Sequence, residues 1–237
     1  MLAAKLLSVR GLPITFVGST TAAIAAGSSG TTNVSLTALT GGLASAPAAD
    51  DLVIVYYGTG SSTDRSIGVT TAGYTEVAEL FSSDSYATNL SANYKMMGAT
   101  PDTQVTVSAT GSSLDAGAVA IHVWRNVNLA SPLDVTSTTA TGSNSVLCNP
   151  PAITPVTTGA VIVSGGAGAH SRGVQTYSSS NLSNFATVGA NDVFDVTVGV
   201  GSAVWTSGAF DPAAFTFSGT DTTDYSWAAV TMALRPK

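Results

Sequence analysis

Charged residues are scarce in this chain. Only 9% of its 237 residues are Asp, Glu, Lys or Arg, against about 25% in an average soluble protein. The hydrophobic share of 44% is ordinary, and Ser, Thr, Gly and Ala replace the missing charges. A surface of this kind has few ions that lose water when copies pack together, so the composition favours a protein that works in an assembly.

Basic residues are the rarest charged type, and the net charge is -6. The eight basic residues are scattered along the chain at Lys5, Arg10, Arg65, Lys95, Arg125, Arg172, Arg235 and Lys237. No basic stripe exists that could neutralise phosphates, so we expect no nucleic-acid partner. The sequence also lacks a run of the roughly 18 to 20 apolar residues that a membrane-spanning helix needs, so we expect no membrane partner.

Cysteine is nearly absent. Cys148 is the single cysteine, so it forms no disulfide within the chain and supports no zinc site. Its position beside Pro150 and Pro151 indicates a small apolar residue. We therefore expect no metal and no cofactor to be held by cysteine.

The first thirty residues resemble a secretory signal only in part. Basic residues precede an apolar stretch that ends in small residues at 23–27. However, Pro13, Gly18 and a polar run interrupt the apolar stretch, and Met1 is retained. We expect no cleaved signal peptide, and interpret residues 1–30 as an arm or a first strand.

Two stretches of the sequence recur further along the chain. Pro47–Gly60 recurs 108 positions later as Pro155–Gly168, and Gly98–Arg125 matches Gly208–Arg235 at an offset of 110 without a gap. Two matches at nearly the same offset and in the same order indicate a duplicated structural unit. The rival explanation is that both halves use the same vocabulary of strands and turns.

Short runs of Val, Ile, Thr and aromatic residues alternate with clusters of Gly, Ser, Asn, Asp and Pro, a pattern typical of strands and turns. Helical periodicity is almost absent. The predicted strands are Leu52–Tyr57, Tyr74–Leu80, Leu90–Met97, Gln104–Ala109, Ala118–Trp124, Ala160–Ser164, Val193–Val200, Ala203–Thr206, Ala214–Ser218 and Trp227–Leu234.

About ten strands fit two stacked antiparallel sheets. We predict an all-β fold: a jelly-roll-like antiparallel β-sandwich with internal duplication. Residues 31–237 would form this single sandwich from two halves, 31–125 and 126–237, that share one core. Two small β-sandwiches in tandem are the alternative. The sequence STTA at 19–22 reappears at 137–140, which suggests that the lead-in to each half was copied too.

The aligned strands predict which faces are buried, because side chains alternate along a strand. At the offset of 110, His122 falls on the same position as Met232, which makes it a packed, hydrogen-bonded residue. The opposite face carries Val119, Ile121 and Val123 in the first copy but smaller residues in the second. We expect the first-copy strand to be buried on both sides and the second on one.

His170 is the other candidate base. It lies in the glycine-rich stretch Gly165–Arg172, which we interpret as an exposed loop. Ser171 and His170 could join a loop aspartate in a Ser-His-Asp site, but no G-x-S-x-G sequence frames a nucleophile. The glycines have neither the following helix nor the lysine of a phosphate-binding loop, so we interpret them as a copied turn that needs positive φ or a tight bend. We predict no catalytic residue and no enzyme.

The carboxylates show no metal-binding pattern. None has the dense spacing of a calcium loop, so turn capping and solvation are the expected roles, and no metal is predicted. The pair in the last loop is the best calcium candidate. The acidic pairs considered are Asp50 with Asp51, Asp192 with Asp195, and Asp221 with Asp224.

Aromatic residues could form a platform for a sugar. Trp205 and Tyr177 are the candidates that we expect to face a ligand, so a glycan is one candidate partner. Arg125 and Arg235 end equivalent strands in the two halves. This placement indicates structural anchors rather than a ligand site.

Several motifs together resemble β-sandwich proteins encoded by tailed bacteriophages. These are Pro47 followed by DDLVIV at 50–55, AGYTEV at 72–77, VWRNV at 123–127 before SPLD at 131–134, and WAAVTMALRP at 227–236. The resemblance covers most of residues 45–236. The chain has Asp50-Asp51 where Gly-Asp is the commonest form, and this difference affects a turn.

The resemblance implies a virion component of the tail, fibre or head-decoration type. Its partners would be other virion proteins, including further copies of itself in a homo-oligomer. It would be made in the bacterial cytoplasm and reside in the phage particle. We therefore expect a non-enzymatic structural protein. A carbohydrate- or receptor-binding module is the alternative, and a hydrolase is third.

Overall fold

The regular structure of the described residues consists of β-strands without any helix, so the predicted all-β class is confirmed. A computed structural model describes residues 12–27, 30–84, 86–110, 115–145, 147–170, 173–191, 194–218 and 225–237. Its strands are β1 (Thr15–Ile24), β2 (Thr31–Ser35), β3 (Leu52–Ser61), β4 (Ile67–Val69), β5 (Thr75–Ser82), β6 (Ala87–Met96), β7 (Gln104–Ala109), β8 (Gly117–Arg125), β9 (Thr138–Ser145), β10 (Leu147–Cys148), β11 (Val161–His170), β12 (Tyr177–Ser178), β13 (Ser183–Ala190), β14 (Asp195–Val204), β15 (Phe215–Phe217) and β16 (Tyr225–Leu234). Within this part of the chain no helix is long and apolar enough to cross a bilayer.

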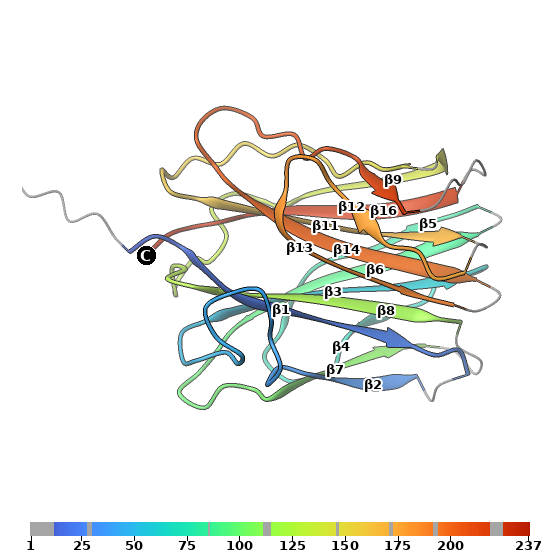
Figure 1. Ribbon diagram of the computed structural model, residues 1–237, viewed down its shortest axis with the longest axis horizontal. Coiled ribbons are helices and arrows are strands. Elements are labelled where there is room, and N and C mark those ends of the chain that lie inside the picture. Colours follow the sequence, from blue (N-terminus) through green and yellow to red (C-terminus); the bar gives the residue numbers. More distant parts are fainter. Residues whose placement is uncertain are drawn as a thin grey trace, which may run out of the picture.

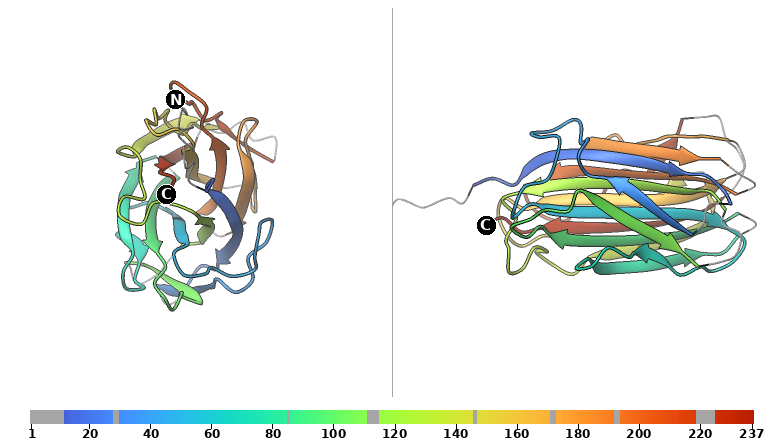
Figure 2. Two further views of the ribbon diagram at one scale, coloured as in Figure 1. Left: turned by 90° about the vertical axis from the view of Figure 1, so that its left-hand side faces the viewer. Right: turned by 90° about the horizontal axis from the view of Figure 1, so that it is seen from below.

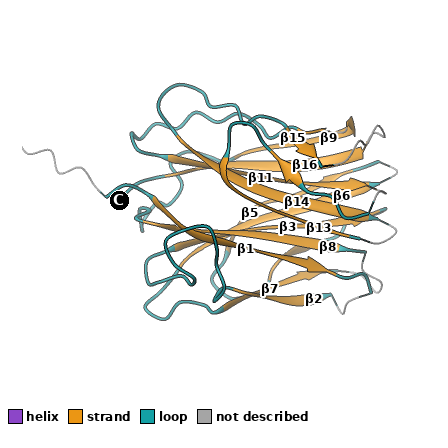
Figure 3. Ribbon diagram, viewed as in Figure 1, coloured by secondary structure: helices purple, strands orange, loops and turns teal. Residues whose placement is uncertain are grey.

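The strands form four antiparallel sheets that lie in layers. The stacking order is β2-β7-β4, then β1-β8-β3-β6-β5, then β13-β14-β11-β16-β9, then β10-β15-β12 (Figure 1). Most strands run along the long axis, and the loops gather at its two ends (Figure 3). The start of β1 and the C-terminus lie at the same end, which we call the terminal end (Figure 2).

Strands β9 to β16 repeat the arrangement of β1 to β8. Adding eight to each strand number converts β1-β8-β3-β6-β5 into β9-β16-β11-β14-β13, and β2-β7-β4 into β10-β15-β12. Eight antiparallel strands in two sheets, with sheet neighbours far apart in the sequence, form a jelly-roll-like sandwich. Each half is therefore a sandwich of its own, with eight strands rather than the five predicted.

The largest core cluster lies between the two five-stranded sheets and takes residues from both halves. It includes Ile54 and Trp124 from the first half and Val163 and Met232 from the second. Smaller clusters lie between each five-stranded sheet and its own three-stranded sheet. The two halves thus share a central core, and each also has an outer core.

The strand register shows that the first sequence match is one residue out of step with the fold. Leu52 pairs with Trp124 on β8, whereas Val161 pairs with Leu234 on β16. Because Trp124 and Leu234 are equivalent in the second match, Leu52 rather than Val53 corresponds to Val161. A shift of one residue turns a side chain to the other face of a sheet. Accordingly, Val53 faces an outer core and Val161 faces the central core. The shared Val-Ile-Val run therefore reflects residue types that both strands favour, and its members do not occupy equivalent positions.

The short STTA match, by contrast, agrees with the register. Thr21 pairs with Ala120 on β8, and Thr139 pairs with Val230 on β16. Ala120 and Val230 are equivalent at the offset of 110. The lead-in strands β1 and β9 therefore occupy equivalent places, with their STTA sequences aligned.

The strands that the sequence prediction missed are β1, β2, β4, β9, β10, β12 and β13. Several consist largely of Ser, Thr, Ala and Gly, as in TFVGSTTAAI for β1 and TTATGSNS for β9. They lie at sheet edges or in the short outer sheets, where less apolar surface is buried. Such strands show little of the alternation on which the prediction depended.

Strand β16 is buried on both sides, which corrects the prediction that one of its faces is open. Its outer face carries small residues because other segments lie close to it. Ala229 contacts the outer core that contains Cys148 and Phe215. Ala233 packs with Ile153.

Candidate functional site

The structure corrects the prediction for His170. Gly165 to His170 form the second half of strand β11 instead of an exposed loop, and the His170 side chain is fully buried. Its Nε2 lies 2.8 Å from Oγ1 of Thr197, and its Nδ1 lies 3.8 Å from Oδ2 of Asp195. The ring also contacts Phe217 edge to face.

A carboxylate, an imidazole and a hydroxyl in line are the parts of a nucleophilic site. Here, however, Thr197 and Asp195 are buried together with His170. Oδ2 of Asp195 also accepts a hydrogen bond of 2.5 Å from the backbone nitrogen of Gly173. In this conformation the group joins β11, β14 and the segment after β11, and its hydroxyl faces no solvent. Ser171, the nucleophile considered from the sequence, lies outside the described residues.

The glycines of β11 make room for neighbouring side chains. A Cβ at Gly165 would lie 2.6 Å from the ring of Tyr56, and one at Gly166 would lie 2.5 Å from the sulfur of Cys148. These glycines have extended backbone, and the positive φ in this region occurs at Gly173. The interpretation of a copied turn is therefore wrong, because close approach explains the glycines of the strand.

His122 packs in the central core, as its alignment with Met232 predicted. Its ring is fully buried and contacts the rings of Phe16 and Trp124. Neither ring nitrogen meets strict hydrogen-bond geometry, and the polar group that acts on the ring is the backbone of Asn184. Burial lowers the pKa of His122 to about 3, and the backbone of Asn184 offsets this only in part. His122 is therefore a neutral packing residue.

Arg125 and Arg235 anchor the strand ends, in agreement with the sequence prediction. Arg125 binds Asp51 through two bonds of 2.8 Å, and Nε of Arg235 lies 3.2 Å from Oδ1 of Asp134. Both carboxylates are fully buried at the side chain. Asp51 directly precedes β3, but Asp134 comes from the crossover between the halves. The same ion pair is therefore built from different parts of the chain.

The two aromatic candidates lie in different environments. Tyr177 is 3% exposed, stacks on Phe217 at 4.6 Å and packs beside Phe215, so it presents no ring face to a ligand. Trp205 is partly exposed at the terminal end, and its Nε1 donates a hydrogen bond of 2.8 Å to the carbonyl of Gly208. The expectation of a ligand-facing ring is wrong for Tyr177.

The acidic candidates do not converge on a metal site in the part of the chain that is described. Asp50 forms an ion pair of 3.3 Å with Lys237. Asp51 binds Arg125, and Asp195 accepts a hydrogen bond from the backbone nitrogen of Gly173. Asp192, Asp221 and Asp224 lie outside the described residues. Among those described, no group of three or more His, Cys, Asp or Glu side chains could hold a metal ion.

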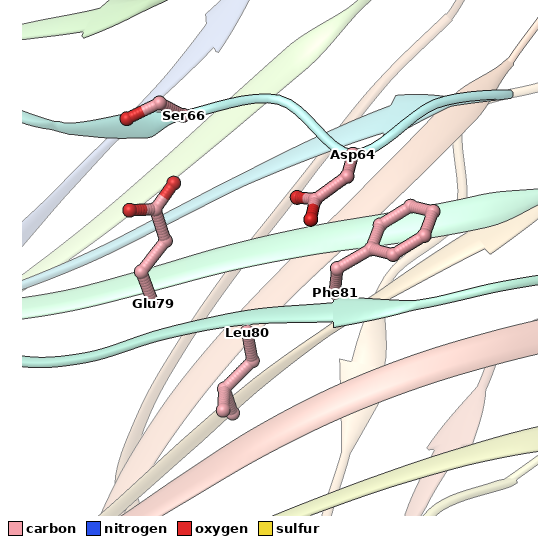
Figure 4. Close-up of a pocket in the computed structure, with 5 residues that line it drawn as sticks. All are labelled: Asp64, Ser66, Glu79, Leu80 and Phe81. Carbon is pink, nitrogen blue, oxygen red and sulfur yellow. The ribbon is translucent and has the colours of Figure 1, made fainter.

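One open groove of about 460 Å³ runs between β5 and the segment that precedes β4. The carboxylates of Asp64 and Glu79 face it, whereas Leu80 points to the other side of β5 (Figure 4). Glu79 accepts a hydrogen bond of 2.7 Å from the backbone nitrogen of Ile67. This carboxylate therefore ties β5 to β4, a structural role.

Two further grooves lie where the edges of the two five-stranded sheets meet. One, of about 460 Å³, is lined by residues of β1 and β13, including Thr20 and Thr187. The other, of about 240 Å³, is lined by residues of β5 and the segment before β9, including Val77 and Ser137. Because β1 corresponds to β9 and β13 to β5, the grooves are equivalent by the internal repeat. They are gaps of the fold that occur once per half.

The terminal end carries exposed apolar side chains. Five of the seven large apolar side chains that are exposed among the described residues lie there, and we call these five the end surface: Val204 (73% exposed), Val156 (70%), Leu12 (67%), Leu43 (59%) and Leu129 (49%). Single exposed apolar residues are ordinary in folded proteins, whereas several at one end form a candidate for an interaction surface.

The fold brings these five residues to one end through the loops. The backbone nitrogen of Leu43 bonds the carbonyl of Phe16 at the start of β1. Val156 bonds the buried Asp134 through its backbone nitrogen, and Val204 ends β14 opposite Val161. Sequence reasoning missed the end surface. For four of the five, the available signal was a large apolar residue beside Gly, Pro or Asn in a turn segment, as in Leu12-Pro13 and Gly42-Leu43, whereas Val204 at the end of β14 has no such neighbour.

The end surface, with Trp205 beside Val204, is the candidate functional site, and it is suited to packing rather than to chemistry. No family model, curated protein or solved structure matches this chain. The resemblance to phage virion proteins therefore depends on the quoted sequence motifs alone.

Proposed function

We propose that this chain is a non-enzymatic structural protein that acts by packing against other proteins, as a component of a tailed-phage virion. The single observation that carries the proposal is the end surface, which holds five of the seven large apolar side chains that are exposed among the described residues. Burial of apolar surface is the main favourable term in protein association.

The rest of the molecule supports a rigid building block. Two jelly-roll-like sandwiches share a central core, and polar contacts cross between the halves. The Tyr56 hydroxyl donates to the carbonyl of Val230 at 3.0 Å, and the Thr88 hydroxyl donates to the carbonyl of Ser226 at 2.8 Å. Jelly-roll sandwiches are common in viral capsids and in lectins, so the fold agrees with both leading functions and decides between neither.

The scarcity of charge also favours packing. Few ions on the surface lose water when subunits meet, so association costs little desolvation. The described buried ionisable groups at the terminal end, Asp51 and Asp134, are already paired with Arg125 and Arg235.

The test is whether the chain is part of the particle. Virions of the phage that encodes the chain would be purified through a density gradient and examined by quantitative mass spectrometry and antibody-labelled electron microscopy. We expect a fixed copy number per particle, and a loss of incorporation for Val156→Asp with Val204→Asp. Absence of the chain from virions would overturn the proposal.

Glycan binding is the competing outcome, because Trp205 is partly exposed beside Val204. A glycan array probed with the purified chain tests it. Binding that Trp205→Ala abolishes, together with absence from virions, would favour a carbohydrate-binding module.

A further inference from the structure

We infer that two copies of this chain join edge to edge through strand β2, so that their β2-β7-β4 sheets become one continuous antiparallel sheet. β2 is an edge strand of this sheet, which lies on the outside of the molecule (Figure 1). The inference goes beyond the proposed function, because it concerns a surface distinct from the end surface and names its partner as a second copy of the chain.

The hydrogen bonds between β2 and β7 show which backbone groups of β2 are left at the free edge. In an antiparallel pair, a strand bonds its neighbour at every second residue. Around β2, the Leu36 nitrogen donates to the carbonyl of Thr103, and the Gly30 carbonyl accepts from the nitrogen of Ala109. The register between these two pairs is continuous, so the even-numbered residues bond β7. The residues whose N–H and C=O groups point away from β7 are Thr31, Asn33 and Ser35.

The free edge of β2 is open. Among the described residues, no other segment bonds the backbone of Thr31, Asn33 or Ser35 at this edge, and all three residues are exposed. Val34 lies between them, faces the outer core and is 3% exposed, so it holds the strand in place. The edge therefore presents a regular row of donors and acceptors, a pattern that pairs with another strand.

The edge strands of the two five-stranded sheets are protected against such pairing. In β1, β5, β9 and β13 the register shift places an extra residue in the edge strand itself, and such bulges disturb the ladder that a further strand would extend. The edge of β1 is also occupied, since Ser19 and Thr40 exchange two backbone hydrogen bonds of 2.9 Å. At β9, the Ser82 hydroxyl donates to the Gly142 carbonyl at 2.8 Å. These four edges are therefore poor sites for strand addition.

The other edges of the outer sheets belong to β4, β10 and β12, which have only two or three residues each. Side chains already occupy two of these edges. The Glu79 carboxylate accepts a bond of 2.7 Å from the Ile67 nitrogen of β4, and the Thr187 hydroxyl accepts one of 2.9 Å from the Tyr177 nitrogen of β12. β2, by contrast, pairs with β7 over five residues without a register shift. Among the described edges, that of β2 is therefore the best suited to pairing.

The β2 edge is complementary to a second copy of itself. When two β2 strands run antiparallel about a two-fold axis at Asn33, Asn33 meets Asn33 of the second copy and Thr31 meets Ser35 of the second copy. Each of these pairs joins residues whose N–H and C=O groups both face the edge, so about six hydrogen bonds form. The same surface is used by both copies, so the assembly closes at a dimer. This match in hydrogen bonding favours a second copy over a foreign strand.

The side chains along the edge support the same pairing. The Thr106 hydroxyl donates to Oδ1 of Asn33 at 2.7 Å, which orients this exposed amide. Opposite residues of an antiparallel pair lie side by side, so Nδ2 of Asn33 is placed to donate to Oδ1 of Asn33 in the second copy. None of the five residues of β2 is charged, and no like charges meet across the axis.

Disulfide crosslinking tests the pairing directly. Asn33→Cys places two thiols opposite each other at the axis, and the Cα separation of about 5.5 Å in such a pair lies within the range that a disulfide spans. Thr70→Cys is the matched control, because Thr70 is exposed next to β4, at the opposite edge of the same sheet. Cys148 is buried and does not compete. Under mild oxidation we expect at least tenfold more linked dimer from Asn33→Cys than from Thr70→Cys.

Charge exchange at the same position gives an independent measurement on the full chain. Sedimentation velocity should show that Asn33→Lys and Asn33→Asp each raise the dissociation constant of the dimer at least tenfold, because like charges then face each other across the axis. An equimolar mixture of the two variants should restore the dimer, since opposite charges then meet. Thr70→Lys should leave the dissociation constant unchanged, and circular dichroism checks that each variant folds.

Three outcomes of sedimentation overturn the inference. They are a chain that stays monomeric at high concentration, a dimer that neither charged variant at Asn33 weakens, and a dimer that both variants weaken but their mixture does not restore. Equal yields of linked dimer from the two cysteine variants would overturn it as well. None of these results touches the proposed function, which fails only when the chain is absent from virions.

Discussion

Tyr56 of β3 lies directly on Gly165 of β11, the residue at the equivalent position of the other half. A Cβ at Gly165 would be 2.6 Å from the Tyr56 ring. Two residues further along each strand the glycine is in the first half instead, because a Cβ at Gly58 would be 2.7 Å from the Cβ of Ala167. Two copies of the first half would place two tyrosines against each other here. The central core is therefore fitted to two unlike halves.

We predict that Gly165→Ala destabilises the protein by about 1–3 kcal/mol, because the new methyl group overlaps the Tyr56 ring in a packed core. Urea unfolding followed by fluorescence measures this change. Gly98→Ala is the control, since nothing lies within 4 Å of its Cβ position. In a Tyr56→Leu background the Gly165→Ala change should cost at least about 1 kcal/mol less. If Gly165→Ala destabilises the wild-type protein and the Tyr56→Leu variant equally, the contact between residue 165 and the Tyr56 ring is not the cause.

Asp134→Asn should destabilise the protein more than Arg235→Met. Asp134 is buried and accepts hydrogen bonds from the backbone nitrogens of Val156 and Thr157 and from the Thr157 hydroxyl. An amide in its place turns a donor toward these donors, at a cost of about 3 kcal/mol. In Arg235→Met the carboxylate keeps the other partners. Thermal unfolding of both variants decides the order, and a larger loss for Arg235→Met would reverse it.

Protonation of the Asp134 carboxylate should lower the free energy of unfolding in acid. Burial by itself would raise the pKa of Asp134, but hydrogen bonds from Thr157, Val156 and Arg235 outweigh it and lower the pKa below the usual 3.8. Its stabilisation is present above pH 3.8 and is lost as pH falls through the lower folded value. Asp134→Asn should lower the stability at every pH, flatten its pH dependence below about pH 4 and leave the slope unchanged above that pH.

His122 should make the protein lose stability at a higher pH than Asp134 does, because its window of titration lies above that of the carboxylate. Its pKa is lowered from 6.5 to about 3 in the folded chain. The unfolded state therefore takes up a proton first as pH drops from 6.5 to 3, and the linked loss is about 4–5 kcal/mol. His122→Met, which copies the residue at the equivalent position 232, should flatten the curve across this window. An unchanged slope between pH 6 and 4 would show that His122 is not the titrating group.

Cys148 should be inert to thiol reagents in the folded protein. The side chain is 1% exposed, and burial raises the pKa of the thiol, so little reactive thiolate forms. We expect labelling by an aromatic disulfide reagent to follow global unfolding, with a rate that rises with urea as unfolding does. Rapid stoichiometric labelling in native buffer would contradict the burial of the Cys148 thiol.

Sequence patterns predicted the strands that carry large apolar residues, since alternation and β-branched residues report burial directly. They missed β1, β9 and β13, because edge strands of Ser, Thr and Ala bury little apolar surface of their own. His170 was misplaced for a related reason: glycine suggests a turn in a sequence, but in β11 it makes room for Tyr56 and Cys148 from other segments.

The sequence by itself determined the all-β class, the position of strands such as β3 and β8, the packing role of His122 and the anchoring role of Arg125 and Arg235. These follow from local composition, alternation and the repeat. Only the tertiary structure decided that each half is an eight-stranded sandwich, that Leu52 corresponds to Val161, and that Asp134 takes the place of Asp51 in the second half. Only it gathered Leu12, Leu43, Leu129, Val156 and Val204 at one end. Each of these depends on contacts between residues far apart in the chain, which a local pattern does not encode.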